Sequence, residues 1–298
     1  MRLALVGDTM LGRKVAEAIA ERGAEALVAD EVVAVAREAD LFVLNLECCI
    51  SGRGERVRQP GKPFFFRAPP EATAVLQRLG VDCVTLANNH ALDYGAEALL
   101  DTIALLRDAG IAAVGAGADR DWARAPALLE AGGLRLAVFG CADHPREYAA
   151  GQATPGIAYG LDWLPAAIAA VEADAVLVTP HWGPNMAAAP LPRIRRAARD
   201  LRAAGATLVA GHSAHVFHGV EDGILYDLGD FLDDYAVDPV LRNDLGLLFL
   251  VDLDRDRVRG IEIVPLRLDF CHTRLADDAD AARIRERFAE ACRALETA

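Results

Sequence analysis

The sequence lacks any segment that would cross a membrane. None of its apolar runs reaches the roughly 20 consecutive residues that a membrane-spanning helix needs. The first residues, MRLALVGD, are apolar only for the length of one β-strand before Asp8 interrupts them, so the pattern of a secretory signal peptide is missing as well. We therefore expect a cytoplasmic protein that does not associate with a membrane.

Paired cysteines and an excess of positive charge are also missing. The six cysteines include no C-x-x-C pair, and six in 298 residues do not indicate a disulfide framework. Lys and Arg number 31 against 44 Asp and Glu, which gives a net charge of −13. This charge argues against nucleic-acid binding. It is compatible with an anionic substrate, because a local metal cluster can outweigh a diffuse negative field.

What the sequence does have is the composition and rhythm of an α/β protein. Hydrophobic residues make up 53% and charged residues 25%, as in folded globular domains. Short β-rich runs alternate with segments of helical period, which predicts parallel strands joined by right-handed crossovers. The predicted strands are 2–6, 41–46, 82–87, 111–114, 134–140, 174–179 and 206–210, and the predicted helices are 11–23, 71–79, 95–109, 163–172 and 191–204.

The rhythm changes after about residue 220. Three apolar segments, GILYDLGDFL, GLLFLVDLD and RGIEIVPLRL, follow one another with only short turns between them. This spacing leaves little room for helices and predicts an antiparallel addition to the sheet. A last helix is expected over residues 278–296. We interpret residues 1–298 as a single domain with its core in residues 1–270.

Five apolar runs each end at side chains that can bind a metal. The carboxyl ends of parallel strands lie along one edge of a sheet, so these side chains would meet there. Burying carboxylates together without a cation would cost on the order of several kcal/mol, which a divalent ion removes. Carboxylate and imidazole ligands together suit Zn, Mn or Fe. The side chains at these strand ends are Asp8, Glu47, Asn88, Asn89, His90, His181, His212 and His215.

Each of these residues, taken alone, has a purely structural alternative. A single histidine at a strand end is often only hydrogen-bonded, and Asn88 and Asn89 would also suit a left-handed turn. His212 and His215 form the sharpest local signal, because Gly211 allows the backbone to turn as the strand ends. Two irregular segments, 51–70 and 142–162, are predicted to be loops over the strand ends.

Seven short motifs occur in an order that resembles a known family. They are GDTMLGR, NLE, FRAPPE, ANNHALDYG, PHWG, GHSAHV and LYDLGDF, and they span roughly residues 3–250. In this order they resemble the CapA family of capsule and poly-γ-glutamate synthesis proteins, a branch of the calcineurin-like metallophosphoesterase superfamily. The resemblance implies an α/β fold, a four-layer α/β/β/α sandwich with mixed sheets, and a dinuclear metal site at the strand ends.

The resemblance also implies a role for each matching residue. His90, beside a ligand, would donate a proton to the leaving group. Arg13, which ends GDTMLGR, would hold an anionic group of the substrate. The implied metal ligands are Asp8 and His215 for the first ion, Asn89, His181 and His212 for the second ion, and Glu47 as the bridge between them.

The sequence departs from the family pattern at several places. Met10 stands where metallophosphoesterases usually have a histidine, so the first metal is expected to lack one ligand. Asp230 replaces a preferred asparagine in LYDLGDF, and His218 follows GHSAHV where glutamine is more frequent. His218 would be either an additional base or ligand or, as we expect, a solvent-exposed loop residue. The membrane anchor that is common in the family does not occur in these 298 residues.

The leading hypothesis is a hydrolase in which two divalent ions, Mn, Zn or Fe, activate water to cleave a phosphoester or a γ-glutamyl-type amide. Lys62, Arg67 and His144, from the two loops, are candidate contacts for an anionic small-molecule or peptide substrate. Two alternatives remain open. One is an oxygen-using iron enzyme, favoured by the gap at Met10, and the other is a non-catalytic accessory subunit of poly-γ-glutamate synthesis. The oligomeric state is left open.

Overall fold

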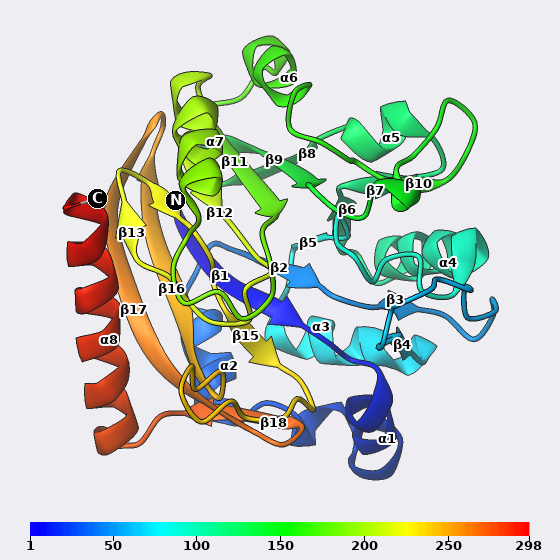
Figure 1. Cartoon of the computed structure of the whole chain (residues 1–298), viewed down its shortest axis with the longest axis horizontal. Coiled ribbons are helices and arrows are strands. Elements are labelled where there is room, and N and C mark those ends of the chain that lie inside the picture. Colours follow the sequence, from blue (N-terminus) through cyan, green and yellow to red (C-terminus); the bar gives the residue numbers. More distant parts are fainter. Residues whose placement is uncertain (298) are drawn as a thin grey trace.

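Two β-sheets form the framework of the chain (Figure 1). The structure, a computed structural model, describes residues 1–297. The larger sheet has the strand order β18-β17-β16-β1-β2-β5-β6, with β15 paired to β1. Its strands are β1 (Arg2–Thr9), β2 (Leu41–Leu46), β5 (Cys83–Thr85), β6 (Ala112–Val114), β15 (Asp230–Leu232), β16 (Leu245–Asp254), β17 (Arg257–Asp269) and β18 (His272–Leu275).

The second sheet has the order β13-β14-β12-β11-β9-β8. Two short strand pairs, β3 with β4 and β7 with β10, lie outside both sheets. The strands of the second sheet are β8 (Ala127–Ala131), β9 (Leu134–Ala142), β11 (Ala175–His181), β12 (Leu208–Ala210), β13 (Val220–Glu221) and β14 (Ile224–Leu225). The short pairs are β3 (Cys49–Ile50) with β4 (Arg67–Ala68) and β7 (Ala116–Gly117) with β10 (Gly156–Ile157).

The parallel strands were predictable from their apolar runs. β1, β2, β5 and β6 pair in parallel, and so do β9, β11 and β12, at positions that match the predicted strands to within a few residues. β16, β17 and β18 pair antiparallel, as the change of rhythm predicts. The prediction of a mixed sheet with antiparallel strands from the C-terminal part is therefore confirmed.

The helices cover the outer faces of the two sheets (Figure 1). The predicted helices are all present, but α2 and α5 were not predicted, because each is too short to show a clear helical period. The helices are α1 (Arg13–Arg22), α2 (Asp30–Ala36), α3 (Thr73–Leu79), α4 (Gly95–Asp108), α5 (Arg120–Arg124), α6 (Leu164–Ala170), α7 (Pro192–Ala203) and α8 (Asp278–Glu296), with 3-10 turns η1 (Ala24–Ala26), η2 (Pro70–Ala72) and η3 (Arg146–Tyr148).

Three apolar cores explain the layered arrangement. Successive residues of a strand point to opposite faces, so in β1 Leu3 packs between the sheets while Ala4 packs toward the helices. The core between the sheets joins residues such as Leu5 of the larger sheet to Leu177 of the second. The outer cores bury α1 to α4 against the larger sheet and α6 and α7 against the second. The fold is the four-layer α/β/β/α sandwich that the sequence implies.

One predicted strand is wrong in an informative way. GILYDLGDFL was expected to be a single strand of an antiparallel addition, but it divides into β14 of the second sheet and β15 of the larger sheet. Both halves pair in parallel, β14 with β12 and β15 with β1. The crossing depends on Gly229, whose φ of 76° is left-handed, and on Gly7, where an added Cβ would lie 1.8 Å from the Gly229 carbonyl oxygen. The crossing brings Asp230 beside Asp8.

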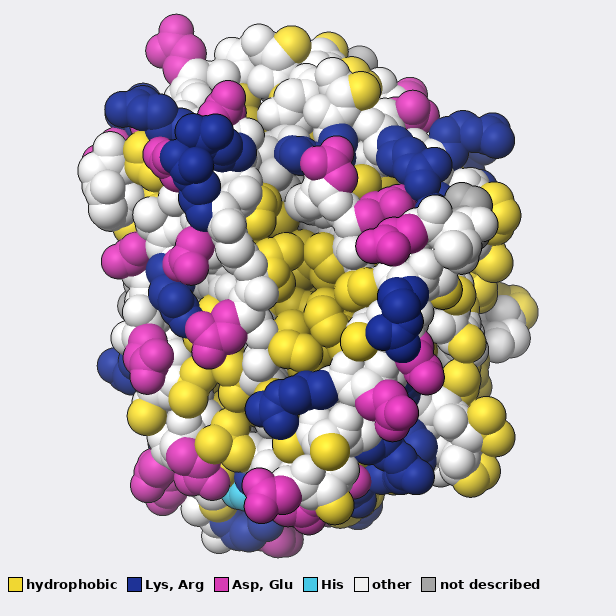
Figure 2. Space-filling model, turned by 90° about the vertical axis from the view of Figure 1, so that its left-hand side faces the viewer, with side chains coloured by type: hydrophobic (Ala, Val, Ile, Leu, Met, Phe, Trp, Pro, Cys, Tyr) yellow, Lys and Arg dark blue, Asp and Glu magenta, His cyan; other side chains and the backbone are white. Residues whose placement is uncertain are grey.

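Helix α8 lies along the side of the molecule that Figure 2 shows. Its Ile284 joins the core between the sheets, and Phe288 packs against Phe217 and Phe249. On this side, hydrophobic side chains form the floor of a hollow, and basic and acidic side chains surround it (Figure 2). Over the described residues, no helix is both long and apolar enough to span a membrane.

Candidate metal centre

The strand ends of both sheets converge on one buried place. Asp8 lies at the end of β1, Glu47 directly follows β2, and His181 is the last residue of β11. A backbone bridge joins His181 to His212, which follows β12. Asp8, Glu47, His181 and His212 are all at most 2% exposed. The convergence that the strand ends predicted is therefore present, and it joins residues from both sheets.

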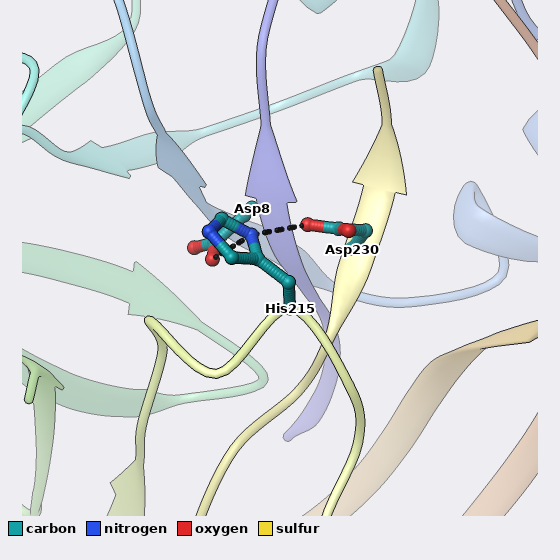
Figure 3. Close-up of side chains that lie close together, drawn as sticks. All are labelled: Asp8, His215 and Asp230. Atoms are coloured by element: carbon teal, nitrogen blue, oxygen red, sulfur yellow. Dashed lines mark hydrogen bonds and ion pairs between the residues drawn. The ribbon is translucent and has the colours of Figure 1, made fainter. Parts of the chain in front are cut away.

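Asp8, His215 and Asp230 form a first group of possible ligands (Figure 3). One ligand atom from each residue lies within 4.8 Å of the others. The His215 Nδ1 atom is 2.8 Å from Asp230 Oδ1 and 3.3 Å from Asp8 Oδ2. The sequence drew attention to Asp230 only as a departure from the family pattern, because its position beside Asp8 depends on the crossing between the sheets.

Asp8, Glu47 and His181 form a second group by the same distance. Asn45 donates a hydrogen bond of 2.6 Å to Asp8 Oδ1, and the His212 Nδ1 atom lies 3.9 Å from that oxygen. Glu47 Oε2 accepts a bond of 3.1 Å from the Tyr235 hydroxyl. Asp8 is thus the carboxylate that the two groups share, and the bridging role that the resemblance implies for Glu47 stays a prediction.

Several polar atoms at this place are buried without a hydrogen-bond partner in the described part of the chain. A buried polar atom without a partner costs free energy, so such atoms are rare unless a ligand or ion satisfies them. Their lone pairs are the kind that a divalent cation accepts, so the donor set fits a metal. The atoms are Glu47 Oε1, His181 Nε2, His212 Nδ1 and Asp230 Oδ2, and Asn89 Oδ1, next to His90 in the chain, is another buried atom without a partner.

Burial sets the protonation of these side chains. It raises the pKa of Glu47 well above its usual value, and the nearby charge of Asp8 adds to the effect. It also raises the pKa of Asp230, to about 6. Burial lowers the pKa of His212 to about 4 and that of His181 well below its usual value. The two imidazoles are therefore neutral at pH 7, which is the form that binds metals.

His90 lies at the edge of the site in a defined orientation. Its Nδ1 atom is 2.6 Å from Asp93 Oδ2, and its ring stacks on Phe66 with centroids 3.9 Å apart. Burial lowers the pKa of His90 to about 4 although Asp93 opposes this change. Its ring is therefore neutral at pH 7 in this arrangement, and its role as a proton donor stays a prediction.

Only some of the predicted substrate contacts lie beside the candidate site. Arg13 lines a cavity together with His90 and His215, and the His144 ring lies 5.4 Å from the His181 ring. The Lys62 amino group instead lies 2.8 Å from Asp93 Oδ1 and also donates to the Asn89 carbonyl.

Arg67, the remaining predicted contact, lies away from these side chains. It donates to the backbone carbonyls of Arg53 and Gly54 and stacks over Tyr94. In the described structure, Lys62 and Arg67 therefore hold the 51–70 loop in place through these contacts. Of the three predicted cations, Arg13 is the one that lies beside the cavity.

Sequence reasoning missed two residues that organise the site. Asp93 orients His90 and also accepts bonds from the Phe66 backbone N–H and the Tyr148 hydroxyl. Its position three residues after His90 was a usable signal, since both lie in ANNHALDYG. Tyr235, which donates to Glu47, follows the last strand-end motif and carried no such signal.

Sequence comparison shows to which family the chain belongs. Residues 2–235 match the family described as bacterial capsule synthesis protein PGA_cap. The chain belongs to this family. Within the PGA_cap family it is 34% identical, over 83% of its length and 70% of the relative, to a probable polyglutamine synthesis accessory protein of Mycobacterium tuberculosis. It is 30% identical to the PGA biosynthesis protein CapA of Bacillus subtilis, over 77% of this chain and 62% of that protein.

Other findings concern length and fold. The chain spans about three fifths of the CapA proteins of Bacillus subtilis and Bacillus anthracis. Its fold is similar to a phosphatase of Mycoplasma pneumoniae, with a TM-score of 0.55 at 13% identity, over 95% of this chain and 96% of the other. A hypothetical protein of Thermus thermophilus gives a TM-score of 0.54 at 17% identity, over 90% and 99%. The PGA_cap chain thus shares its fold with these two proteins.

Proposed function

We propose that this PGA_cap protein is a metal-dependent hydrolase with a dinuclear centre at the strand ends. The observation that supports this most directly is the set of buried, unpartnered atoms of Glu47, His181 and Asp230, which belong to two groups that share Asp8. Two divalent ions bound there would activate water and polarise the scissile bond. Such a centre serves the cleavage of a phosphoester or of a γ-glutamyl-type amide.

In this proposal another residue replaces the histidine ligand that is missing at Met10. The Met10 side chain is fully buried in the apolar core, and its sulfur accepts the backbone N–H of Gly12. Asp230 lies beside Asp8 and His215 and would take the place of the missing imidazole. The gap that motivated the redox alternative would thereby be filled. Glu47, Asn89, His181 and His212 would hold the second ion.

The protein's own side chains keep these ligands in position. Asn45 donates to Asp8, and Asn88 donates to the Asn45 side-chain oxygen and to the Leu46 carbonyl. Asp93 holds the His90 ring by one nitrogen, so the other nitrogen is available at the edge of the cavity. Such a ring can exchange a proton with a leaving group or with water.

A second candidate function is that of an accessory subunit in polymer synthesis. The name of the Mycobacterium tuberculosis relative, a probable polyglutamine synthesis accessory protein, favours it. In that case the metals would bind an acidic polymer without cleaving it, and a protein partner would do the chemistry.

The test is metal content together with turnover. We expect about two equivalents of Mn, Zn or Fe per chain by elemental analysis, and hydrolysis of an aryl phosphate or of a γ-linked glutamyl dipeptide. Glu47→Gln and His181→Ala should lower both metal content and turnover, turnover by more than about 100-fold. Arg22→Gln, at the exposed end of α1, serves as the matched control. Full activity of the metal-stripped chain would contradict the proposal.

A further inference from the structure

A cavity of about 550 Å³ opens beside the candidate metal centre. Six separate segments line it, namely the start of α1, the 51–70 loop, the turn after β5, the turn after β11, the turn after β12 and the segment after β15. His90 and His215 form the wall that faces the metal ligands. The side chains that line the cavity include Arg13, Phe64, Phe66, His90, His215 and Tyr235.

Two aromatic rings connect this cavity to the centre. Phe66 stacks on His90, and Tyr235 donates its hydroxyl hydrogen to Glu47. The same two rings, together with Phe64, surround the guanidinium group of Arg13, whose Cζ atom lies 5.3 Å from the Phe64 centroid, 5.5 Å from Phe66 and 5.9 Å from Tyr235. Phe66 and Tyr235 thus each lie against Arg13 and also contact a residue of the candidate centre.

Arg13 is held from one side only. Its Nη2 atom lies 3.1 Å from Asp234 Oδ1, and the Asp234 carboxylate is fully buried and also accepts the backbone N–H of Lys14. No other acceptor contacts the Arg13 guanidinium among residues 1–297, and the side chain is 34% exposed. A guanidinium group has five N–H donors in a planar fork that fits a carboxylate or phosphate, so most of its donors remain available.

The outer wall of the cavity is apolar and exposed. Phe64 is 55% exposed and Val237 is 51% exposed, although large hydrophobic side chains are usually buried. The segment that carries Val237 is fixed internally: the Asp238 carboxylate accepts the backbone N–H groups of Val240 and Leu241, and the Asp238 backbone N–H donates to the Asn243 side-chain oxygen. A ligand in the cavity would cover this apolar wall and strengthen any ion pair made there, because it excludes water.

We propose that Arg13 binds a second acidic group of the substrate, a carboxylate or a phosphate, while the bond to be cleaved lies at the His90 and His215 wall. The inference rests on the proposed hydrolase function and adds a substrate class to it. The preferred substrates are compounds with two acidic or phosphoryl groups joined by a short, partly apolar body that crosses the Phe66 and Tyr235 rings. Arg13 is then a specificity-determining residue.

The kinetic test uses three aryl phosphates that differ only in the para substituent, which is a carboxamide, a carboxylate or a phosphonate. The wild type should prefer the two acidic compounds, and the better of them identifies the favoured acid. In Arg13→Gln, kcat/KM should fall about 10- to 100-fold for the acidic compounds and less than about threefold for the carboxamide. Arg13→Lys should restore part of the loss, and Arg22→Gln on the same helix should behave as wild type. Equal losses for all three compounds, or none, would overturn the inference.

A binding measurement separates this inference from the proposed function. Glutarate and its neutral diamide are titrated calorimetrically into the chain as purified, with Arg13→Gln and Arg22→Gln alongside. Glutarate should bind the wild type more tightly than the diamide does, and should lose at least about tenfold in affinity in Arg13→Gln alone. If that holds while neither a phosphate ester nor a γ-linked glutamyl dipeptide is cleaved, the hydrolase proposal fails and the acid-binding site stands. Binding of glutarate that does not depend on Arg13 would overturn the site.

Discussion

At the scale of single residues, Asp8 and Asp230 differ in how much of the site depends on them. Asp8 accepts hydrogen bonds from Asn45 and from the backbone N–H of Ser213, and it belongs to both ligand groups. Asp230 contacts His215 through Oδ1, and its Oδ2 has no partner among the described residues. A substitution at Asp230 therefore affects one group and leaves the other in place.

Asp230→Ala should release about one of two bound metal equivalents, because the first group keeps only Asp8 and His215. Asp230→Asn retains an oxygen ligand and should lose less. Elemental analysis after exhaustive dialysis measures the ratio of metal to protein. Asp252→Asn, on the half-exposed end of β16, is the control. Two equivalents retained in Asp230→Ala would show that Asp230 is not a ligand.

His218 is the residue whose environment was predicted wrongly from the sequence. It was expected to be solvent-exposed, but it is only 5% exposed, and its Nε2–H donates to the Ala187 carbonyl. The reason is that the turn after His215 folds back between the segment that follows β11 and helix α8. Burial, aided by the nearby charge of Arg287, lowers the pKa of His218 to about 4.

This buried histidine should make folding sensitive to acid. Above pH 6.5 the ring is neutral in both states and contributes no pH dependence. As the pH falls from about 6.5 toward 4, the unfolded chain binds a proton that the folded chain excludes, so the free energy of unfolding falls by up to about 3 kcal/mol. Urea unfolding across this range should show a shallower loss in His218→Gln than in the wild type. Parallel curves for the two proteins would contradict this account.

At the scale of elements, the crossing between β14 and β15 determines where the first ligand group forms. The backbone N–H of Asp8 donates to the Gly229 carbonyl at 2.8 Å, and β15 continues beside β1 from that point. The contact is close enough that only glycine fits at position 7. The crossing affects the candidate metal site because it sets the register of β15 against β1, which places Asp230 opposite Asp8.

Gly7→Ala should disrupt this contact. The added methyl carbon would lie 1.8 Å from a backbone oxygen, so β1 and β15 must separate. We expect a loss of at least about 2–3 kcal/mol in the free energy of unfolding, measured by urea denaturation, and a lower metal content. Gly52→Ala is the matched control, because nothing lies within 4 Å of its added Cβ. Equal stability of the two variants would be evidence against the crossing as described.

The elements also show what sequence could and could not predict. Buried parallel strands leave continuous apolar runs, so their ends, and with them Asp8, Glu47, His181 and His212, were visible as candidates. The split of GILYDLGDFL was not visible, because two short strands in different sheets leave the same pattern as one long strand. The ion pair of Lys62 with Asp93 was not visible either, because nothing in a loop sequence shows which carboxylate lies beside a lysine; the role of Lys62 as a substrate contact stays a prediction.

At the scale of the whole molecule, the candidate centre lies where the strand ends of the two sheets meet. Asp8 and Glu47 come from the larger sheet, and His181 and His212 come from the second. An ion held by both pairs would connect the sheets in addition to the apolar core between them. Metal binding should therefore stabilise the entire fold.

Removal of the metal should lower the melting temperature. A ligand at about 100 times its dissociation constant adds roughly 2.7 kcal/mol, which for a chain of this size corresponds to a shift of about 4 °C. Differential scanning fluorimetry with and without a chelator measures the shift. Glu47→Gln, which should bind less metal, should show a smaller change on chelation. An equal shift in both proteins would mean that the chelated metal lies elsewhere.

The chain segment that joins β14 to β15 also sets a limit on how far the sheets can move. Only five peptide steps separate Leu225 from Asp230, and a fully extended chain spans at most about 3.6 Å per residue. The two sheets are therefore tethered covalently within about 18 Å of each other at the site, whatever the state of the metals. This limit keeps the strand ends of the two sheets near one another when the ions leave, so we expect the site to reload without refolding of the sandwich.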